Sequence, residues 1–339
     1  MTEKMGVAVL GTGWVAGEHI RAFQQNPHTE VVALLSRDKA RAEAKAREFN
    51  LTGCRPYTDL DALLRDDEVK IVSSCTPHHL HAPQAIAAAE SGRHVVVEKP
   101  IALDLESLYA LRDAVARARV KSVVSFALRW LPISENIKAL IADGMVGNIY
   151  YAEADYMHDV GPWYSGYEWI RHKNVGGSAL LSAGCHAVDA LRWFVGQEVV
   201  EVFSYANFSA SNPLKYDYEP NSITCLKFTG GVIGKVGCSF EAMMPYSFPV
   251  LILGDQGAIR NDQVCSKRWP GQRGWATIPT ILADTADVTH HPFAGQMNHF
   301  VDCILRDRES HCNVADAVKT HEICFAAETS AREGRPVKL

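Results

Sequence analysis

Short apolar segments and helical segments alternate over roughly the first 125 residues, and this alternation limits the fold more than any other feature of the chain. The apolar segments are rich in Val and Ile and lie at 7–10, 31–35, 71–75, 95–97 and 123–126. Strands of this kind are typical of a parallel sheet that is buried on both faces. Because segments long enough for a crossover helix separate them, the pattern predicts a doubly wound sheet with ligands at the carboxyl ends of its strands. Gly11, Thr76 and Lys99 then lie at one edge.

The pattern changes after Trp130, and the remaining segments predict a second α/β domain. Helices are expected at 132–143, 178–194, 295–306 and 313–333. A strand is expected at 149–158, and partial alternation of apolar and polar residues predicts antiparallel strands at 199–208, 223–228 and 232–240. We therefore expect a dinucleotide-binding domain over 1–126 and a domain with a mostly antiparallel sheet over 127–339.

The overall composition narrows the possible partners. The 339 residues carry a net charge of −5, with 22% charged and 47% hydrophobic residues, so we expect a globular protein that binds no nucleic acid. No apolar segment reaches the length of about 18 residues that a membrane span needs, and residues 1–10 lack the pattern of a signal peptide. The nine cysteines are scattered singly, without a C-x-x-C pair, which indicates reduced thiols and a cytoplasmic protein.

A glycine-rich turn directly follows the first predicted strand and opens a helix. Its sequence is Gly11-Thr12-Gly13-Trp14-Val15-Ala16. In such a turn the first glycine allows a tight bend, the second lets backbone amides approach a pyrophosphate, and the small residue at the end allows the helix to pack closely on the sheet. The amino end of the helix then faces the phosphate charge. We therefore predict that Gly11, Thr12, Gly13, Trp14 and Val15 bind a dinucleotide, with a plain tight turn as the alternative.

The end of the second predicted strand bears on which dinucleotide is bound. An acidic residue there would bind the ribose hydroxyls of NAD, whereas this chain has Ser36-Arg37, a hydroxyl and a planar cation that suit the ribose phosphate of NADP. We therefore predict NADP as the favoured cofactor. NAD stays open because Asp38 follows directly, and Arg37 could also stack on the adenine or be a solvated residue at the start of a helix.

A histidine-rich segment follows the strand at 71–75. Its sequence is Thr76-Pro77-His78-His79-Leu80-His81, which invites a metal interpretation. Because Pro77 interrupts the spacing and no carboxylate or cysteine joins the histidines, we expect no metal site. We predict instead that the segment caps the next helix and lines the cofactor groove through Thr76, Pro77, His78 and His81.

The sequence Glu98-Lys99-Pro100 ends the next predicted strand. An amine at the buried end of a sheet can have a lowered pKa and can exchange a proton with an alcohol or carbonyl oxygen during hydride transfer. We therefore predict Lys99 as an acid–base group next to the cofactor, with Glu98 able to pair with its amine. A surface Glu–Lys pair is the alternative, which the apolar segment before it disfavours.

These motifs, in this order, resemble those of the Gfo/Idh/MocA oxidoreductases, the family of glucose–fructose oxidoreductase and inositol dehydrogenase. The resemblance rests on the Gly11–Ala16 turn, Glu98-Lys99-Pro100, Arg129, Gly176-Gly177-Ser178-Ala179-Leu180-Leu181, Gly184-Cys185-His186 and Asp189. It implies a Rossmann domain, followed by a substrate-binding and oligomerisation α/β domain with an open, mostly antiparallel sheet. It further implies NAD or NADP, a sugar or polyol substrate from carbohydrate metabolism, and a homodimer or homotetramer.

By the same resemblance Lys99 and His186 match the family's catalytic lysine and histidine. Many dehydrogenases of the family carry an aspartate four residues before this histidine, where the chain has Ser182. An aspartate there would lie on the helical face of the histidine and could raise its basicity, whereas serine can only hydrogen-bond. Asp189 is then the remaining carboxylate on that face. Either Lys99 and His186 share the proton transfer, or the reaction differs from simple inositol oxidation.

The remaining candidates are side chains that could wall a pocket. The segments 159–175 and 269–295 are long loops without clear periodicity, and such loops are often functional. Their tryptophans could stack on a sugar ring, although a loop tryptophan can also be a plain anchor. Arg129 is predicted to contact the cofactor. The predicted substrate contacts, besides Lys99 and His186, are Tyr156, His158, Trp163, Trp169, Arg171, Ser182, Cys185, Asp189 and His291.

Together these features predict reversible hydride transfer between the carbinol carbon of a sugar or cyclitol and a nicotinamide, with Lys99 and His186 exchanging the hydroxyl proton. Two other functions stay open. One is redox-neutral cleavage or isomerisation of a glycoside with a retained NAD, and the other is a non-catalytic NAD(P)-binding regulator. The presence of both Lys99 and His186 disfavours the regulator.

Overall fold

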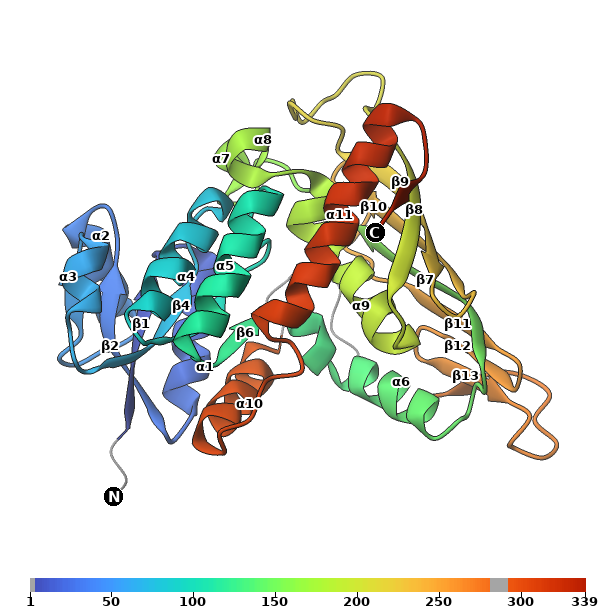
Figure 1. Ribbon diagram of the computed structural model, residues 1–339, viewed down its shortest axis with the longest axis horizontal. Helices are drawn as coiled ribbons and strands as arrows, with labels where there is room; N and C mark the ends of the chain where they lie inside the picture. The colour runs from blue at the N-terminus through green and yellow to red at the C-terminus, as the bar shows by residue number, and fades with distance from the viewer. Residues whose placement is uncertain (1–3, 281–291) are drawn as a thin grey trace. The chain divides into compact units, whose positions relative to one another are not determined.

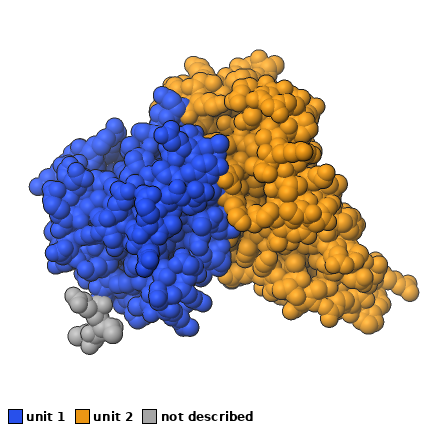
Figure 2. Space-filling model, in the orientation of Figure 1, with its two compact units in different colours: residues 1–127, 174–176, 292–318 blue, residues 128–173, 177–291, 319–339 orange. Residues whose placement is uncertain are grey.

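The computed structural model describes residues 4–280 and 292–339, which form two compact units (Figure 2). The first unit consists of the residues up to 127 together with 174–176 and 292–318. The second consists of 128–173, 319–339 and the segment that starts at 177. The division into folding domains between 126 and 127 stays a prediction. The segment 292–318, although near the carboxyl terminus, packs with the first unit.

The strands of the first unit form a parallel sheet of six strands, in the order β3-β2-β1-β4-β5-β6 (Figure 1). The chain adds β2 and β3 on one side of β1, and then β4, β5 and β6 on its other side. This order confirms the predicted doubly wound sheet, and its switch point lies between β1 and β4. The three-residue strand β3 was not predicted, because it has Pro56 at its centre and no apolar pattern. The strands are β1 (Met5–Leu10), β2 (Thr29–Leu35), β3 (Arg55–Tyr57), β4 (Val69–Ser74), β5 (His94–Val97) and β6 (Ser122–Val124).

Helices cover this sheet, and α1 begins at the glycine-rich turn. They are α1 (Trp14–Gln25), α2 (Lys39–Glu48), α3 (Leu60–Leu64), α4 (His81–Glu90), α5 (Leu105–Ala118) and α10 (Phe293–Leu305). Ile20 and Phe23 of α1 are fully buried. Helix α10 packs against α1, where the Asn26 amide donates to Asn298 Oδ1 at 2.8 Å. The helix that we expected at 295–306 in the second domain therefore packs with the first unit.

The second unit is built on a sheet of nine strands, in the order β14-β13-β12-β11-β7-β10-β9-β8-β15. Neighbouring strands are antiparallel except for β7 and β10, which confirms the predicted, mostly antiparallel sheet. The strands β11–β14 were not predicted, since each is only two to five residues long. The strands are β7 (Ile149–Met157), β8 (Val199–Asn207), β9 (Asn221–Phe228), β10 (Ile233–Ser239), β11 (Val250–Gly254), β12 (Gly257–Arg260), β13 (Gln263–Ser266), β14 (Ala276–Thr277) and β15 (Val337–Lys338).

Helices cover one face of the nine-stranded sheet. Ala152, Ala154 and Tyr156 of β7 are buried and alternate with half-buried residues, because successive strand residues point to opposite faces. Helix α9 packs on β7, and α11 lies beside it (Figure 1). The remaining helices are α6 (Pro132–Ala142), α7 (Tyr167–Ile170), α8 (Lys173–Gly176), α9 (Cys185–Val195) and α11 (Val314–Glu333). Within 4–280 and 292–339, none of the helices has the length and apolar character that crossing a bilayer requires.

Candidate active site

The turn between β1 and α1 depends on glycine and leaves the start of α1 uncapped. Gly11 has a φ of +105°, and a Cβ atom there would lie 2.5 Å from the carbonyl oxygen of Cys75, so only glycine fits. Gly13 precedes α1 without a side-chain cap, and a Cβ there would meet no atom within 4 Å. The first amides of α1 are therefore open to an anion such as a pyrophosphate.

Two polar side chains of the segment after β2 accept hydrogen bonds from backbone amides. The Asp38 carboxylate accepts a hydrogen bond from the Ala40 amide at 2.9 Å and so caps α2. Ser36 Oγ accepts a hydrogen bond from the Asp38 amide at 3.3 Å. The Arg37 side chain is exposed beside them. A cation and a hydroxyl, rather than an uncommitted carboxylate, thus stand at the end of β2.

The histidines after β4 anchor neighbouring loops. His81 Nδ1 lies 2.7 Å from the carbonyl oxygen of Pro100, and its Nε2 lies 2.7 Å from that of Thr76. His78 Nδ1 lies 2.7 Å from the carbonyl oxygen of Gly176. Burial lowers the pKa of both rings. No side chain caps α4, so the expected capping role is wrong: the His81 ring lies between two carbonyl oxygens instead, and its neutral form donates its one N–H to one of them.

Glu98 lies at the end of β5 and is buried, not part of a surface pair. Its Oε1 lies 3.0 Å from His19 Nε2, and its Oε2 accepts a hydrogen bond from the Lys99 amide at 3.3 Å. Burial acts to raise the pKa of Glu98, but the hydrogen bond and charge of His19 lower it. Burial likewise opposes the charge on His19, but the neighbouring Cys75 and Glu98 raise its pKa to about 10. Sequence reasoning missed His19.

His186 of the second unit lies in a cluster of aromatic rings. Its ring stacks on that of Tyr156, with 6.1 Å between centroids and 14° between planes. Tyr156 and His158 each contact the ring of Tyr246 at 5.2 Å, and His158 contacts Trp163 at the same distance. The structure thus brings together four predicted residues of β7, its following loop and α9.

Tyr246 is a member of this cluster that sequence reasoning missed. Its hydroxyl is buried and has no hydrogen-bond partner among the described residues. Burial raises the pKa of the phenol, which therefore stays protonated and can donate to a ligand. Its segment shows no periodicity, and the only signal in the sequence is the aromatic pair Tyr246 and Phe248 between two prolines.

Ser182 and Cys185 precede His186 by four residues and by one residue, and both are buried. Residues Leu180–Gly184 form a π-helical segment directly before α9. A π-helix bonds residue i to i+5 instead of i+4. The expectation that Ser182 lies one α-helical turn before His186 is therefore wrong. Gly184 is required here, because a Cβ atom would lie 2.9 Å from Cys238 Sγ on β10.

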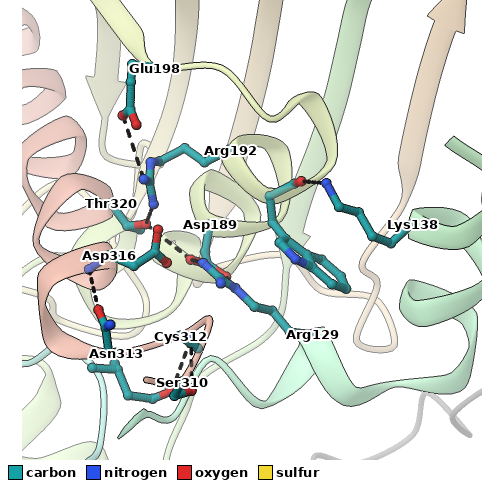
Figure 3. A network of polar contacts seen from close by, with 12 residues as sticks. Arg129, Lys138, Asp189, Arg192, Glu198, Ser310, Cys312, Asn313, Asp316 and Thr320 are labelled. Atoms are coloured by element: carbon teal, nitrogen blue, oxygen red, sulfur yellow. Dashed lines mark hydrogen bonds and ion pairs between the residues drawn. The ribbon is translucent and has the colours of Figure 1, made fainter. Parts of the chain in front are cut away.

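Arg129 and Asp189 bind each other inside the second unit (Figure 3). Asp189 also accepts a hydrogen bond from Thr320 at 3.2 Å, and Thr320 in turn accepts one from Arg192 at 2.9 Å. Only 4% of Arg129 and 1% of Asp189 is exposed. Their predicted roles as cofactor and substrate contacts stay predictions, but the pair has a clear role in holding α9.

The other predicted substrate contacts lie in the loop after β7. Trp163 is 57% exposed and donates from Nε1 to the Asp159 carbonyl at 2.7 Å. Arg171 donates to Glu168 at 3.1 Å and lies over the ring of Tyr167. Trp169 is half-buried at the end of α7. His291 lies outside the described residues. Within 4–280 and 292–339, no group of three His, Cys, Asp or Glu side chains could hold a metal ion.

Comparison with known families places both halves of the chain in one oxidoreductase family. The family described as "Oxidoreductase family, NAD-binding Rossmann fold" matches residues 5–126, and the "GFO/IDH/MocA C-terminal domain" matches residues 134–260. The chain is 26% identical to scyllo-inositol 2-dehydrogenase (NAD(+)) of Bacillus subtilis, over 100% of this chain and 97% of the relative.

Two further similarities involve levoglucosan dehydrogenases. The enzyme of Pseudarthrobacter phenanthrenivorans is 27% identical, over 71% of this chain and 68% of its own length. A solved structure of levoglucosan dehydrogenase in complex with NADH has a TM-score of 0.90 and 24% identity, and 99% of each chain is covered. The latter similarity supports the fold.

Proposed function

Because the chain belongs to the Gfo/Idh/MocA family of NAD-binding oxidoreductases, we propose that it is a dehydrogenase that oxidises a secondary alcohol of a sugar or cyclitol. The observation that carries this proposal is the uncapped start of α1 after the Gly11–Gly13 turn, which suits a pyrophosphate. The names of the similar enzymes, scyllo-inositol and levoglucosan dehydrogenase, support the substrate class. The nicotinamide would supply the hydride acceptor.

Lys99 and His186 are proposed as the groups that move the substrate proton. The Lys99 Nζ is proposed to take the substrate hydroxyl proton in the oxidative direction. An imidazole nitrogen of His186 is proposed as the second group able to accept this proton, and the group that holds it returns it in the reductive direction. Stacking on Tyr156 orients the His186 ring for this task.

The aromatic cluster around His186 is proposed to hold the ring of the substrate. Trp163 and Tyr156 offer aromatic surface for the apolar face of a sugar or cyclitol. The buried Tyr246 hydroxyl offers a donor for one substrate hydroxyl. A ligand that pairs with it would satisfy a polar group that is otherwise costly to bury.

We further propose that the enzyme prefers NADP over NAD. Asp38 caps α2, and the hydroxyl of Ser36 and the guanidinium of Arg37 are the groups at the end of β2 that suit a ribose phosphate. The similar enzymes named for NAD(+) and NADH make NAD the competing outcome.

A homodimer or homotetramer is proposed through the face of the nine-stranded sheet that the helices leave open. Tyr205 and Ile223 are paired on this face and are 64% and 47% exposed. Exposed apolar patches of this kind favour association. Light scattering coupled to gel filtration would find a monomer if the proposal is wrong. A reducing, cytoplasmic location is proposed from the nine cysteines, all of which are free thiols.

The function is tested with the purified protein in three steps. Denaturation and analysis of the released nucleotides identifies any retained cofactor. The protein is then titrated with NADP and NAD, and incubated with inositols, levoglucosan and pentoses while reduced nicotinamide is followed by absorbance. Turnover of a polyol with free cofactor exchange supports the proposal. Stoichiometric retained NAD with no net reduction would favour redox-neutral glycoside chemistry, and cofactor binding without turnover would favour a regulator.

A further inference from the structure

A buried histidine connects three elements of the first unit behind the cofactor edge of its sheet. His19 of α1 is fully buried. Its Nε2 lies 3.0 Å from Glu98 Oε1 at the end of β5, and its Nδ1 lies 2.7 Å from Ser73 Oγ on β4. Both ring nitrogens are therefore used, and the ring cannot turn without losing a contact. The catalytic roles proposed above do not explain this residue.

The carboxylate that His19 contacts also holds the backbone of Lys99. Glu98 Oε2 accepts a hydrogen bond from the Lys99 amide at 3.3 Å. Ser125, which follows β6, donates to the same carboxylate and itself accepts a hydrogen bond from Gln296 of α10 at 3.0 Å. A buried carboxylate of this kind stays ionised only with a counter-charge and hydrogen-bond donors around it. The His19 ring supplies a charged donor to this carboxylate. Lys99, the next residue after Glu98 in the chain, supplies its backbone amide.

We propose that His19 is a positioning residue for Lys99: its ring fixes the Glu98 carboxylate, and this carboxylate fixes the chain at Lys99. The inference rests on the proposed catalytic role of Lys99. The groups that face the His19 ring are Ser73 and Cys75 from the β4 side, Glu98 from β5, and the Phe293 ring of α10 at 5.0 Å. The neighbouring Cys75 and Glu98 raise the pKa of His19 to about 10 against the effect of burial, so the ring is an imidazolium at neutral pH.

The charge of His19 has a consequence that a purely structural residue would not have. In His19→Gln the amide can still donate to Glu98, but the positive charge that balances this carboxylate is gone. The buried Glu98 carboxylate is then held less firmly, and its hydrogen bond from the Lys99 amide weakens. The Lys99 amide proton should therefore exchange with solvent about 10-fold faster in the variant.

The test uses the full chain with ¹⁵N-labelled lysine, and NMR follows the exchange of the Lys99 amide proton with D2O. Lys99→Arg assigns the signal. Ile20→Val is the matched control, because Ile20 is a fully buried neighbour on α1 and its loss of a methyl group costs about 1 kcal/mol without changing any charge. We expect faster exchange of the Lys99 amide in His19→Gln and not in Ile20→Val. An unchanged exchange rate in His19→Gln, or an equal acceleration in both variants, would overturn the inference.

A second measurement does not depend on the folding of His19→Gln. Nitrogen-15 NMR of the wild-type protein with labelled histidine, with the His19 signal assigned from its displacement in Ser73→Ala, should show a doubly protonated ring at pH 8. A neutral ring would overturn the inference. Failure of the proposed function is distinguished separately: if Lys99→Met retained turnover, Lys99 would not be catalytic, whatever the His19 signals show.

Discussion

The guanidinium of Arg129 binds the carboxylate of Asp189 through two parallel hydrogen bonds, from Nε to Oδ2 at 2.7 Å and from Nη2 to Oδ1 at 2.6 Å. Asp189 lies on α9, three residues after His186. A bidentate pair has a defined geometry as well as a defined charge balance. It therefore connects the start of the second unit to the helix that carries His186 and holds that helix in place.

Replacing Asp189 by Asn is expected to lower the free energy of unfolding by about 3 kcal/mol, because it removes a carboxylate that balances the buried Arg129 charge. Urea unfolding measures the loss. Glu90→Gln is the control, since Glu90 pairs with Arg117 at 3.5 Å on an exposed surface and should cost less than about 1 kcal/mol. Equal losses in the two variants would contradict a stabilising role for the buried pair.

Lys99→Met should reduce kcat by about 100-fold or more while leaving the dissociation constant of the cofactor nearly unchanged, because the amine acts on the substrate proton. Steady-state kinetics and a cofactor titration separate the two effects. Lys70→Met, at an exposed position on β4, serves as the control and should retain wild-type kinetics. A lysine with a structural role would give the opposite pattern, with weakened cofactor binding and residual turnover.

Arg37→Ala should weaken NADP binding by about 10-fold and leave NAD binding almost unchanged, since only NADP carries the ribose phosphate that a guanidinium can bind. Isothermal titration with each nucleotide provides the ratio. Arg41→Ala, at an exposed position in the first turn of α2, should alter neither affinity. A wild-type preference for NAD, or an equal loss for both nucleotides in Arg37→Ala, would be inconsistent with the proposed specificity.

Tyr246→Phe should raise the KM for the substrate several-fold without loss of stability, because the hydroxyl it removes has no partner among the described residues. We expect the opposite result for the control variant Tyr218→Phe. Its hydroxyl donates to the Ile170 carbonyl at 2.9 Å, so the variant should lose about 1 kcal/mol of stability and keep its KM. If both variants lost stability and neither changed KM, Tyr246 would have no role in binding.

The stability of the protein should depend on the charge of His19. Its pKa is raised from 6.5 to about 10, so its contribution is fully present below pH 6.5 and is lost as the pH rises through about 10. The difference in unfolding free energy between wild type and His19→Gln should therefore shrink over this range. Urea unfolding at several pH values measures it, and a difference independent of pH would show that His19 is not charged in the folded protein.

Much of the architecture could be predicted because it depends on local patterns. The apolar strands at 7–10, 31–35 and 71–75 and the turn at Gly11–Ala16 are each contained in a short segment, and all lie where they were expected. Strands β3 and β11–β14 escaped prediction because they are only two to five residues long and lack alternation. Such strands form only when a neighbour supplies hydrogen bonds at their edge.

The sequence by itself determined the doubly wound sheet, the open amino end of α1 and the order of the motifs, since hydrophobic periodicity and glycine conformation act over a few residues. Only the tertiary structure decided which polar groups meet. His19 and Glu98 are 79 residues apart, and Arg129 and Asp189 are 60 apart. Such pairs leave no periodic trace in a sequence, because burial selects partners by their position in space: a charge removed from water needs a counter-charge within contact distance, whatever its place in the chain.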